Sequence, residues 1–424
     1  MHNGGENMEK YIIKGGNKLV GEVEIKGAKN SVLPILAATV ISGKISTIGN
    51  IPNLKDVDIM VKLLSSLGAK LEFKDNHLVI DSGTIDNVIL PEELVREMRS
   101  SIILMGALLA RFKEVKISYP GGCEIGPRPI DLHLKSLRQM GAIIEESHGF
   151  LNCTTSGLIG CEIQLDYPSV GATENIILAA ITAKGTTTLR NAAREPEIID
   201  LQNYLNKAGA KVSGAGTSIV IIEGVEELLS CEYNIIPDRI VAGTFMVAAG
   251  ITKGEIIVKN IILDHLQSII AKLKEAGATI YTNGTSIKVI GPEKINPIEV
   301  LQTLPYPGFP TDMQAQFMAL LTIANGTSII NETIFENRFK HGEEMTRMGA
   351  NIKTFGKVAV IKGVNELTGA KVFAKDLRGG AALVLAGLVA QGVTEVENIH
   401  HINRGYEDFY QKLFDLGANI QRKI

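Results

Sequence analysis

The sequence has no tryptophan, only 5% aromatic residues, and four cysteines among 424 residues. The cysteines, at positions 123, 153, 161 and 231, form no CxxC pair and follow no metal-ligand spacing, so they indicate neither a zinc site nor a disulfide framework. Such sparse cysteine use is typical of a reducing compartment. The longest apolar runs, such as residues 102–110, are too short to span a bilayer.

An excess of positive charge is also lacking. Lys and Arg number 43 against 46 Asp and Glu, and the net charge of −3 argues against nucleic acid as the main partner. Residues 1–10 are polar and lack the apolar core of a signal peptide. We expect a soluble cytoplasmic protein without a membrane partner, in which residues 1–7 form a disordered leader.

A sixfold repeat runs along the chain. A Gly-Ala step follows an amphipathic stretch and precedes a short alternating strand at Gly68, Gly141, Gly209, Gly277, Gly349 and Gly417, with spacings of 68 to 73 residues. Apolar residues before each step recur at helical spacing, as at Leu201, Tyr204, Leu205 and Ala208. Each step therefore predicts the end of a helix, with the glycine as its cap, and then a strand.

Each repeat holds a second helix that is apolar nearly all round. These helices are predicted at residues 32–41, 101–110, 173–183, 242–251, 314–324 and 381–390. A helix without a polar face must be buried. We therefore expect an α/β fold with helices inside and short strands facing solvent. A chain of 424 residues is longer than a single hydrophobic core usually supports, so we expect two domains with three repeats in each.

The domain division follows from the repeats and from the N-terminus. A strand expected over residues 11–20 and 22–25 is predicted to pair with the C-terminal repeats. One domain then comprises residues 8–28 plus 237–424, and the other comprises residues 29–236. The functional site is expected between these domains.

Residues 120–133 (PGGCEIGPRPIDLH) form a shaped loop, because three glycines and three prolines exclude a helix or strand interior. Arg128 follows Cys123 by five residues, and a nearby cation favours a thiolate. The loop is thus a candidate for a reactive cysteine. The alternative is an idle surface cysteine on a turn.

Two further candidates stand where buried helices begin. Lys29 and Asn30 lie at a helix N-terminus, where free N–H groups and the helix dipole suit a phosphate. The simpler alternative is that Asn30 or Ser31 caps the helix and Lys29 is solvated. Asp312 is likewise either a plain N-cap or a general base for a hydroxyl.

Arginines recur at equivalent edges of the repeats, at positions 99, 128, 338, 378 and 404. Singly they indicate surface ion pairs, but together with Lys29 they predict a small, multiply anionic ligand. Residues 169–172 (SVGA) open a buried helix whose N–H groups suit a second anion, such as a nucleotide diphosphate. His133, His400 and His401 lack metal-type spacing and are interpreted as structural or as hydrogen-bond donors.

Nine ordered strings carry a family resemblance that covers residues 8–424. They are GAKN at 27–30, PGGCEIGPRP at 120–129, SVGAT at 169–173, REPEI at 194–198, PDR at 237–239, FPTDMQAQ at 309–316, FENR at 335–338, DLR at 376–378 and RGY at 404–406. They closely resemble the UDP-N-acetylglucosamine 1-carboxyvinyltransferases, enolpyruvyl transferases that open bacterial peptidoglycan synthesis. That family's fold is a two-domain inside-out α/β barrel with three repeats per domain, in agreement with the six repeats found here.

The resemblance implies transfer of the enolpyruvyl group of phosphoenolpyruvate to the 3′-hydroxyl of UDP-N-acetylglucosamine. Phosphate would leave through a tetrahedral intermediate, without a metal or cofactor. Cys123 would donate a proton and can form a covalent phosphothioketal, Asp312 would accept the hydroxyl proton, and Lys29 and Arg404 would also be catalytic.

The resemblance also implies the binding residues. Those for phosphoenolpyruvate are Lys29, Asn30, Arg128, Arg378 and Arg404, and Asp376 with Arg378 would support the intermediate. Those for the UDP-sugar are Arg99, Arg128, Pro129, Ile130, Asp131, Leu132, Ser169, Val170, Gly171, Asp312 and Ile334. Asn403, Gly379, Gly380 and Tyr167 depart from the family's pattern and bear on local rates and loop stiffness rather than on the reaction.

Cysteine at position 123, where some members carry Asp, implies inactivation by the epoxide fosfomycin. Two alternatives stay open. The sister enzyme 5-enolpyruvylshikimate-3-phosphate synthase is disfavoured by the cysteine loop and by residues 169–173. A non-catalytic UDP-sugar-binding paralogue is disfavoured because Lys29, Cys123, Asp312 and Arg404 are all present.

Overall fold

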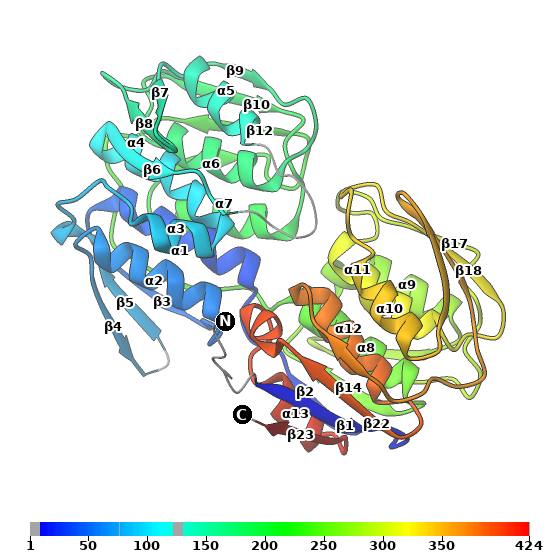
Figure 1. Ribbon diagram of the computed structural model, residues 1–424. Helices are drawn as coiled ribbons and strands as arrows, with labels where there is room; N and C mark the ends of the chain where they lie inside the picture. Colours follow the sequence, from blue (N-terminus) through cyan, green and yellow to red (C-terminus); the bar gives the residue numbers. More distant parts are fainter. Residues whose placement is uncertain (1–8, 76, 122–129, 424) are drawn as a thin grey trace, which may run out of the picture. The chain divides into compact units, whose positions relative to one another are not determined.

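The computed structural model describes residues 9–75, 77–121 and 130–423, and these fall into two compact units (Figure 1). The N-terminal unit comprises described residues 26–121 and 130–236. The C-terminal unit comprises described residues 9–25 and 237–423. The expected leader and the middle of the Cys123 loop lie outside the described residues.

The six Gly-Ala steps end six helices, as the sequence predicts. The helices are α2 (Lys55–Ser66), α5 (Asp131–Gln139), α7 (Pro196–Lys207), α9 (Gln267–Glu275), α11 (Lys340–Arg347) and α13 (Phe409–Asp415). The strands that follow are β4 (Lys70–Lys74), β7 (Ile143–Ser147), β11 (Lys211–Ser213), β15 (Thr279–Asn283), β19 (Asn351–Phe355) and β23 (Asn419–Lys423). All six glycines have φ between 89° and 102°, a left-handed conformation that side-chain-bearing residues avoid.

The second helix of each repeat is buried, which confirms the prediction from its all-round apolar character. These helices are α1 (Lys29–Ser42), α4 (Leu104–Phe112), α6 (Val170–Ala180), α8 (Arg239–Ile251), α10 (Gln314–Leu321) and α12 (Leu377–Gly387). In the N-terminal unit α4 packs against α1 and α6, and in the C-terminal unit α10 packs against α8 and α12. Every residue of α8 is buried.

Small sheets surround these helices (Figure 1). Most strand pairs in them are antiparallel, and five of the sheets also contain one parallel pair. In the described part of the N-terminal unit the strand orders are β13-β3-β5-β4, β11-β12-β10-β9 and β6-β8-β7, and in that of the C-terminal unit they are β21-β22-β1-β23, β15-β16-β14-β2 and β17-β18-β20-β19. The remaining strands are β1 (Lys10–Lys14), β2 (Val20–Glu24), β3 (Ile45–Gly49), β5 (His77–Asp81), β6 (Glu114–Ser118), β8 (Phe150–Thr154), β9 (Glu162–Gln164), β10 (Thr186–Arg190), β12 (Ile219–Glu223), β13 (Cys231–Asn234), β14 (Glu255–Lys259), β16 (Ser286–Ile290), β17 (Val300–Gln302), β18 (Thr327–Asn331), β20 (Val358–Lys362), β21 (Lys371–Phe373) and β22 (Val393–Glu397). The alternating burial of strands such as β1 and β20 places one face on the helices and the other toward solvent.

The N-terminal strands pair with the C-terminal repeats, as predicted, but their bounds differ from the expectation. The stretch expected as one strand over residues 11–20 is divided between β1 and β2. The break lies at Gly15, where an added Cβ would approach the carbonyl oxygen of Ala390 to 2.4 Å. Tyr11 lies in register with Val396 of β22 on one side and Arg422 of β23 on the other.

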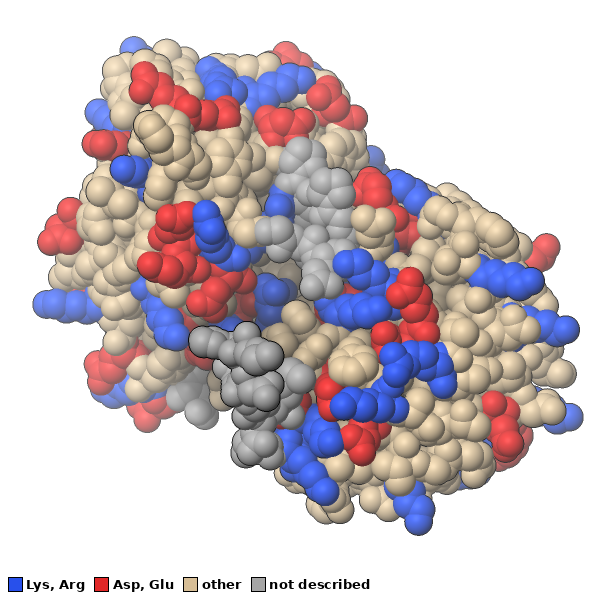
Figure 2. All heavy atoms as spheres, viewed as in Figure 1, with Lys and Arg blue, Asp and Glu red and all other residues tan. Residues whose placement is uncertain are grey.

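The described surface carries charges of both signs. Figure 2 shows Lys and Arg side chains interspersed with Asp and Glu over the visible face, without a broad field of one sign. Within the described residues, no helix combines the length and apolar character needed to cross a membrane.

Candidate active site

Asp312 is a predicted site residue of the C-terminal unit and contacts two arginines. It lies in the 3-10 turn η4 (Thr311–Met313), directly before α10. Its Oδ1 accepts a hydrogen bond from Nη2 of Arg338 at 2.8 Å, and its Oδ2 accepts from Nε and Nη2 of Arg378 at 3.2 and 3.1 Å. The N-cap of this turn is Pro310, so the interpretation of Asp312 as a plain helix cap is wrong.

The two arginines are buried while the carboxylate is not. The side chains of Arg338 and Arg378 are 4% and 3% exposed, against 27% for Asp312. These arginines are therefore not the surface ion pairs that isolated arginines suggest. Guanidinium groups on both carboxylate oxygens fix the orientation of a carboxylate that remains accessible to a ligand.

A buried polar cluster on α8 and α10 lies next to Arg378. Its guanidinium carbon lies 5.2 Å from the ring centre of Tyr406, whose hydroxyl contacts Nε2 of Gln316 and Oγ1 of Thr244, each at 3.0 Å. Burial opposes the charge of Arg378, but Tyr406, Asp312 and Asp238 outweigh it, so the pKa of the guanidinium is raised. Arg378 is thus a fixed cation.

Asp376 supports Arg378 through the backbone. It is the N-cap of α12, and its Oδ1 accepts from the backbone N–H groups of Arg378 and Gly379 at 2.9 Å each. His341 lies beside it, and burial lowers the pKa of this imidazole to about 4, against the opposing effect of Asp376 and with the help of Arg338. Asp376 therefore fixes where α12 begins.

Two further predicted residues of this unit lie in less regular segments. Arg404 ends the 3-10 helix η5 (Ile399–Arg404). Ile334 lies after β18, and its backbone N–H donates to Oε1 of Glu332 at 2.8 Å. The structure therefore joins Asp312 directly to Arg378, and it joins Asp376 to Arg378 through the start of α12.

In the N-terminal unit, Lys29 and Asn30 open α1, as predicted. The helix has Ala28 as its N-cap and no side-chain cap, so the interpretation that Asn30 or Ser31 caps it is wrong. Lys29 Nζ lies 2.9 Å from Oδ2 of Asp56, and the two side chains are 13% and 2% exposed. Lys29 is therefore held in place by a buried carboxylate rather than being freely solvated.

A second buried carboxylate supports the same helix start. Asp200 on α7 accepts hydrogen bonds from Ser31 Oγ and, at 2.5 Å, from the hydroxyl of Tyr233. Burial raises the pKa of Asp200 despite these hydrogen bonds. Sequence reasoning missed Asp56 and Asp200, and the available signal was an acidic residue on the apolar face of each amphipathic helix.

The predicted nucleotide-binding segment opens α6. Ser169 is its N-cap and accepts from the backbone N–H of Ala172 at 3.3 Å. An added Cβ at Gly171 would lie 3.5 Å from Nε2 of His133. This imidazole thus lines the start of α6.

His133 has a defined protonation state. Its Nδ1 lies 2.9 Å from Nδ2 of Asn175, and Oδ1 of that amide accepts from the backbone N–H of Gly106 at 2.6 Å. The amide nitrogen therefore donates to Nδ1, so the imidazole proton is on Nε2, the atom nearer Gly171. Burial, with a smaller contribution from Arg99, lowers the pKa of His133 to about 4.

The other predicted residues of this unit differ in exposure. Arg99 begins the 3-10 helix η2 (Arg99–Ile103), just before α4. Ile130 and Leu132 are 8% and 3% exposed and belong to the hydrophobic core, whereas Asp131 is exposed at the start of α5. Cys123, Arg128 and Pro129 lie outside the described residues.

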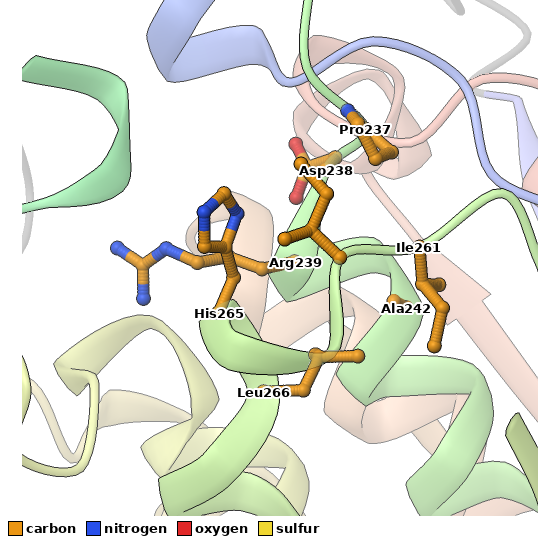
Figure 3. Close-up of a pocket in the computed structure, with 8 residues that line it drawn as sticks. Pro237, Asp238, Arg239, Ala242, Ile261, His265 and Leu266 are labelled. Atoms are coloured by element: carbon orange, nitrogen blue, oxygen red, sulfur yellow. The ribbon is translucent and has the colours of Figure 1, made fainter. Parts of the chain in front are cut away.

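A small pocket lies elsewhere in the C-terminal unit, between the start of α8 and the segment before α9 (Figure 3). Its lining includes Asp238, Arg239 and His265, none of which is a predicted site residue. The space between these side chains has no room even for a water molecule, whereas ligand pockets usually enclose several hundred Å³. We therefore do not assign a substrate to this pocket.

Known proteins similar to this chain belong to one enzyme family. A family model described as EPSP synthase (3-phosphoshikimate 1-carboxyvinyltransferase) matches residues 13–413. A UDP-N-acetylglucosamine 1-carboxyvinyltransferase 2 of Caldanaerobacter subterraneus subsp. tengcongensis is 55% identical over 98% of this chain and 100% of its own length. A UDP-N-acetylglucosamine 1-carboxyvinyltransferase 1 of Carboxydothermus hydrogenoformans is 54% identical over 98% of each chain.

Solved structures confirm the predicted fold class. The enolpyruvyl transferase NikO from Streptomyces tendae has a TM-score of 0.90 at 25% identity, over 98% of this chain and 99% of its own. An EPSP synthase from Acinetobacter baumannii has a TM-score of 0.77 at 18% identity, over 98% of this chain and 100% of its own. The second likeness concerns the fold alone.

Proposed function

The chain belongs to the UDP-N-acetylglucosamine 1-carboxyvinyltransferases within the enolpyruvyl transferase family, and we infer from this that it transfers the enolpyruvyl group of phosphoenolpyruvate to UDP-N-acetylglucosamine. The acceptor atom is the sugar 3′-hydroxyl, and the other product is phosphate. The reaction commits UDP-N-acetylglucosamine to peptidoglycan synthesis. We place it in the cytoplasm, where both substrates would be found.

The observation that carries this proposal is the arrangement around Asp312. A proton acceptor for a hydroxyl must be accessible and held in a fixed orientation. Asp312 meets both requirements, because its carboxylate is 27% exposed and each of its oxygens accepts from a buried arginine. We propose Asp312 as the base that takes the proton of the 3′-hydroxyl.

The donor substrate requires cations, since phosphoenolpyruvate carries a phosphate and a carboxylate. Lys29 stands at the N-terminus of α1, where backbone N–H groups also favour an anion. Asp56 holds its ammonium in place at 2.9 Å. We propose Lys29, Asn30, Arg128, Arg378 and Arg404 as the residues that bind phosphoenolpyruvate.

The UDP part requires a site for a diphosphate and a base. We propose that Ser169, Val170 and Gly171, where the first N–H groups of α6 lie, provide this site, together with Arg99 near His133. Ile130 and Leu132 are buried in the core, so we assign their contribution to the backbone and keep Arg128, Pro129, Asp131 and Ile334 as further contacts.

The proposed chemistry is addition followed by elimination. Cys123 protonates the methylene carbon of phosphoenolpyruvate, and the 3′-oxygen attacks the neighbouring carbon as Asp312 accepts its proton. The tetrahedral intermediate, supported by Arg378 and Asp376, then returns a methyl proton to the Cys123 thiolate and expels phosphate, which restores the double bond. Fixed cations stabilise the negative charge throughout.

Phosphate release from phosphoenolpyruvate tests the proposal, with UDP-N-acetylglucosamine and shikimate 3-phosphate as parallel acceptors. We expect release only with the UDP-sugar, its loss in Cys123→Ala, and inactivation of the wild type by fosfomycin. Release with shikimate 3-phosphate would assign the chain to the sister reaction. UDP-sugar binding without phosphate release would identify a non-catalytic paralogue.

A further inference from the structure

Glu332 is a buried acidic residue that the proposed reaction does not use. It directly follows β18 and is 1% exposed. Its Oε1 accepts from Thr303 Oγ1 at 2.9 Å and from the backbone N–H groups of Ile334 and Phe335 at 2.8 and 3.2 Å. Its Oε2 accepts from Thr311 Oγ1 at 2.8 Å.

Burying a carboxylate is costly unless hydrogen bonds replace its water. The four donors of Glu332 are two hydroxyls and two amides, and within the described residues no Lys or Arg forms an ion pair with it. Charge-assisted hydrogen bonds are shorter and stronger than neutral ones. A buried carboxylate therefore holds its partners more rigidly than a neutral side chain of the same size would.

Three of these partners, Thr311, Ile334 and Phe335, belong to two segments that carry proposed acceptor contacts. Thr311 immediately precedes Asp312, the proposed base. Ile334, whose N–H binds Oε1, is a proposed UDP-sugar contact, and Arg338 farther along the same segment contacts Asp312 at 2.8 Å. The carboxylate of Glu332 thus connects the turn that holds the base to the loop that leads to Arg338.

We propose that Glu332 is a positioning residue for the acceptor, acting through Thr311 to hold Asp312 at the correct distance from the 3′-hydroxyl. This inference rests on the proposed function. The hydroxyl of Thr311 is the link, because it is the contact between Glu332 and the turn that contains Asp312. A displacement of about 1 Å at a catalytic group can cost on the order of 100-fold in rate.

Thr311→Val tests the link, because valine keeps the shape of threonine and removes the hydroxyl. We expect kcat for phosphate release to fall by about 10- to 100-fold, while KM for phosphoenolpyruvate stays within about twofold. Thr311→Ser keeps the hydroxyl and should restore most of kcat. Glu332→Gln changes the other partner and should lower kcat without preventing UDP-sugar binding, measured by calorimetry.

Thr322→Val is the matched control. Thr322 is buried whereas Thr311 is half-buried, and the Thr322 hydroxyl donates to the carbonyl oxygen of Ala319 at 2.6 Å, at the other end of α10 from Asp312. We expect it to lower the melting temperature about as much as Thr311→Val does and to leave kcat unchanged. A purely structural role for Glu332 would make the two valine variants alike in both measurements.

The outcomes separate this inference from the function on which it rests. If the wild type releases no phosphate with the UDP-sugar, the proposed function fails. If the wild type is active and Thr311→Val retains its kcat, the positioning role is wrong and the function stands. If kcat falls equally in the serine and valine variants, the hydroxyl is not the link and the inference also fails.

Discussion

At the scale of single residues, Asp312 combines a catalytic and a structural role. Asp312→Asn should lower kcat for phosphate release by about 10²- to 10⁴-fold, because an amide does not accept the hydroxyl proton. It should also lower the free energy of unfolding by about 2 kcal/mol, since it removes a charge partner from two buried guanidinium groups. Phosphate release and urea unfolding measure the two effects.

Asp264→Asn is the control for this variant. Asp264 lies in the same unit, in the short helix η3 (Leu263–Leu266), and its side chain is exposed. The same chemical change there should alter neither measurement. A stable, fully active Asp312→Asn protein would refute both the assignment of the base and the importance of the paired arginines.

His133 predicts a dependence of stability on pH. Its pKa is about 4 in the folded protein and 6.5 in an unfolded chain, so between these values the unfolded chain binds more protons. The contribution of neutral His133 to the free energy of unfolding is fully present above pH 6.5. It falls by roughly 3 kcal/mol as the pH is lowered toward 4. His133→Gln does not titrate and should therefore lose less stability than the wild type over this range.

Urea unfolding at intervals from pH 7 to pH 4 measures the difference. The glutamine variant is expected to be less stable at pH 7, because the acceptor for the amide of Asn175 is disturbed. The two stabilities should then converge as the pH falls. Parallel pH profiles would show that His133 is not a buried neutral imidazole.

At the scale of the elements, the start of α12 is sterically restricted. An added Cβ at Gly379 would lie 2.7 Å from Oδ2 of Asp376 and 3.1 Å from Cβ of His341. Gly379→Ala should therefore displace the cap that fixes Arg378. Alanine favours a helix over glycine by about 1 kcal/mol, but the loss of the cap should outweigh this gain. We therefore expect a net fall in the free energy of unfolding of about 1 kcal/mol or more.

Gly250→Ala on α8 is the matched comparison. Its added Cβ would meet nothing closer than Leu320 at 3.6 Å, which is an ordinary contact. This variant should be more stable than the wild type by about 0.5 to 1 kcal/mol, because only the helix preference changes. Thermal unfolding of both variants decides the matter, and equal shifts would contradict the role of the Asp376 cap.

The elements that were predictable from sequence are those determined by local pattern. The six Gly-Ala steps predicted six helix ends, because the left-handed glycine and the helical spacing before it lie within a few residues of each other. The division between β1 and β2 was not predictable. It depends on the approach of Gly15 to Ala390, which is distant in sequence.

Local sequence suggested the residues of the candidate site but not the contacts that support them. Local sequence was compatible with Asp312 as a cap or as a base, and it did not indicate the hydrogen bond to Asp312 from Arg378, which lies 66 positions away. Asp200 likewise supports Ser31 across 169 positions. The spacing of apolar residues along the sequence does not predict such contacts, since they form only when separate repeats pack together.

At the scale of the whole molecule, the two units differ in how they depend on the N-terminus. The described strands of the N-terminal unit pair among themselves, and β13 near its end pairs in parallel with β3 near its start. The C-terminal unit contains β1 between β22 and β23, and β2 beside β14. Residues 26–236 should therefore fold alone, whereas residues 237–424 should not.

Deleting residues 9–25 from the C-terminal unit should prevent its folding, because β1 is a central strand of its sheet. Without residues 9–25, β22 and β23 lose their common partner, and the core loses Tyr11, Ile13 and Leu19, which are 2%, 0% and 0% exposed. Each large apolar side chain contributes about 1.5 to 3 kcal/mol when buried. Their combined loss approaches the stability of a typical domain.

Restoring the missing strands tests this explanation directly. Ala28 and Ile236 are joined by a backbone hydrogen bond of 2.8 Å, so Ile25 and Pro237 lie within about 20 Å of each other by chain length. A Gly-Ser linker of roughly eight residues from Ile25 to Pro237 should restore cooperative unfolding, measured by circular dichroism in urea. Cooperative folding of residues 237–424 alone would show that the N-terminal strands only extend a core that is already complete.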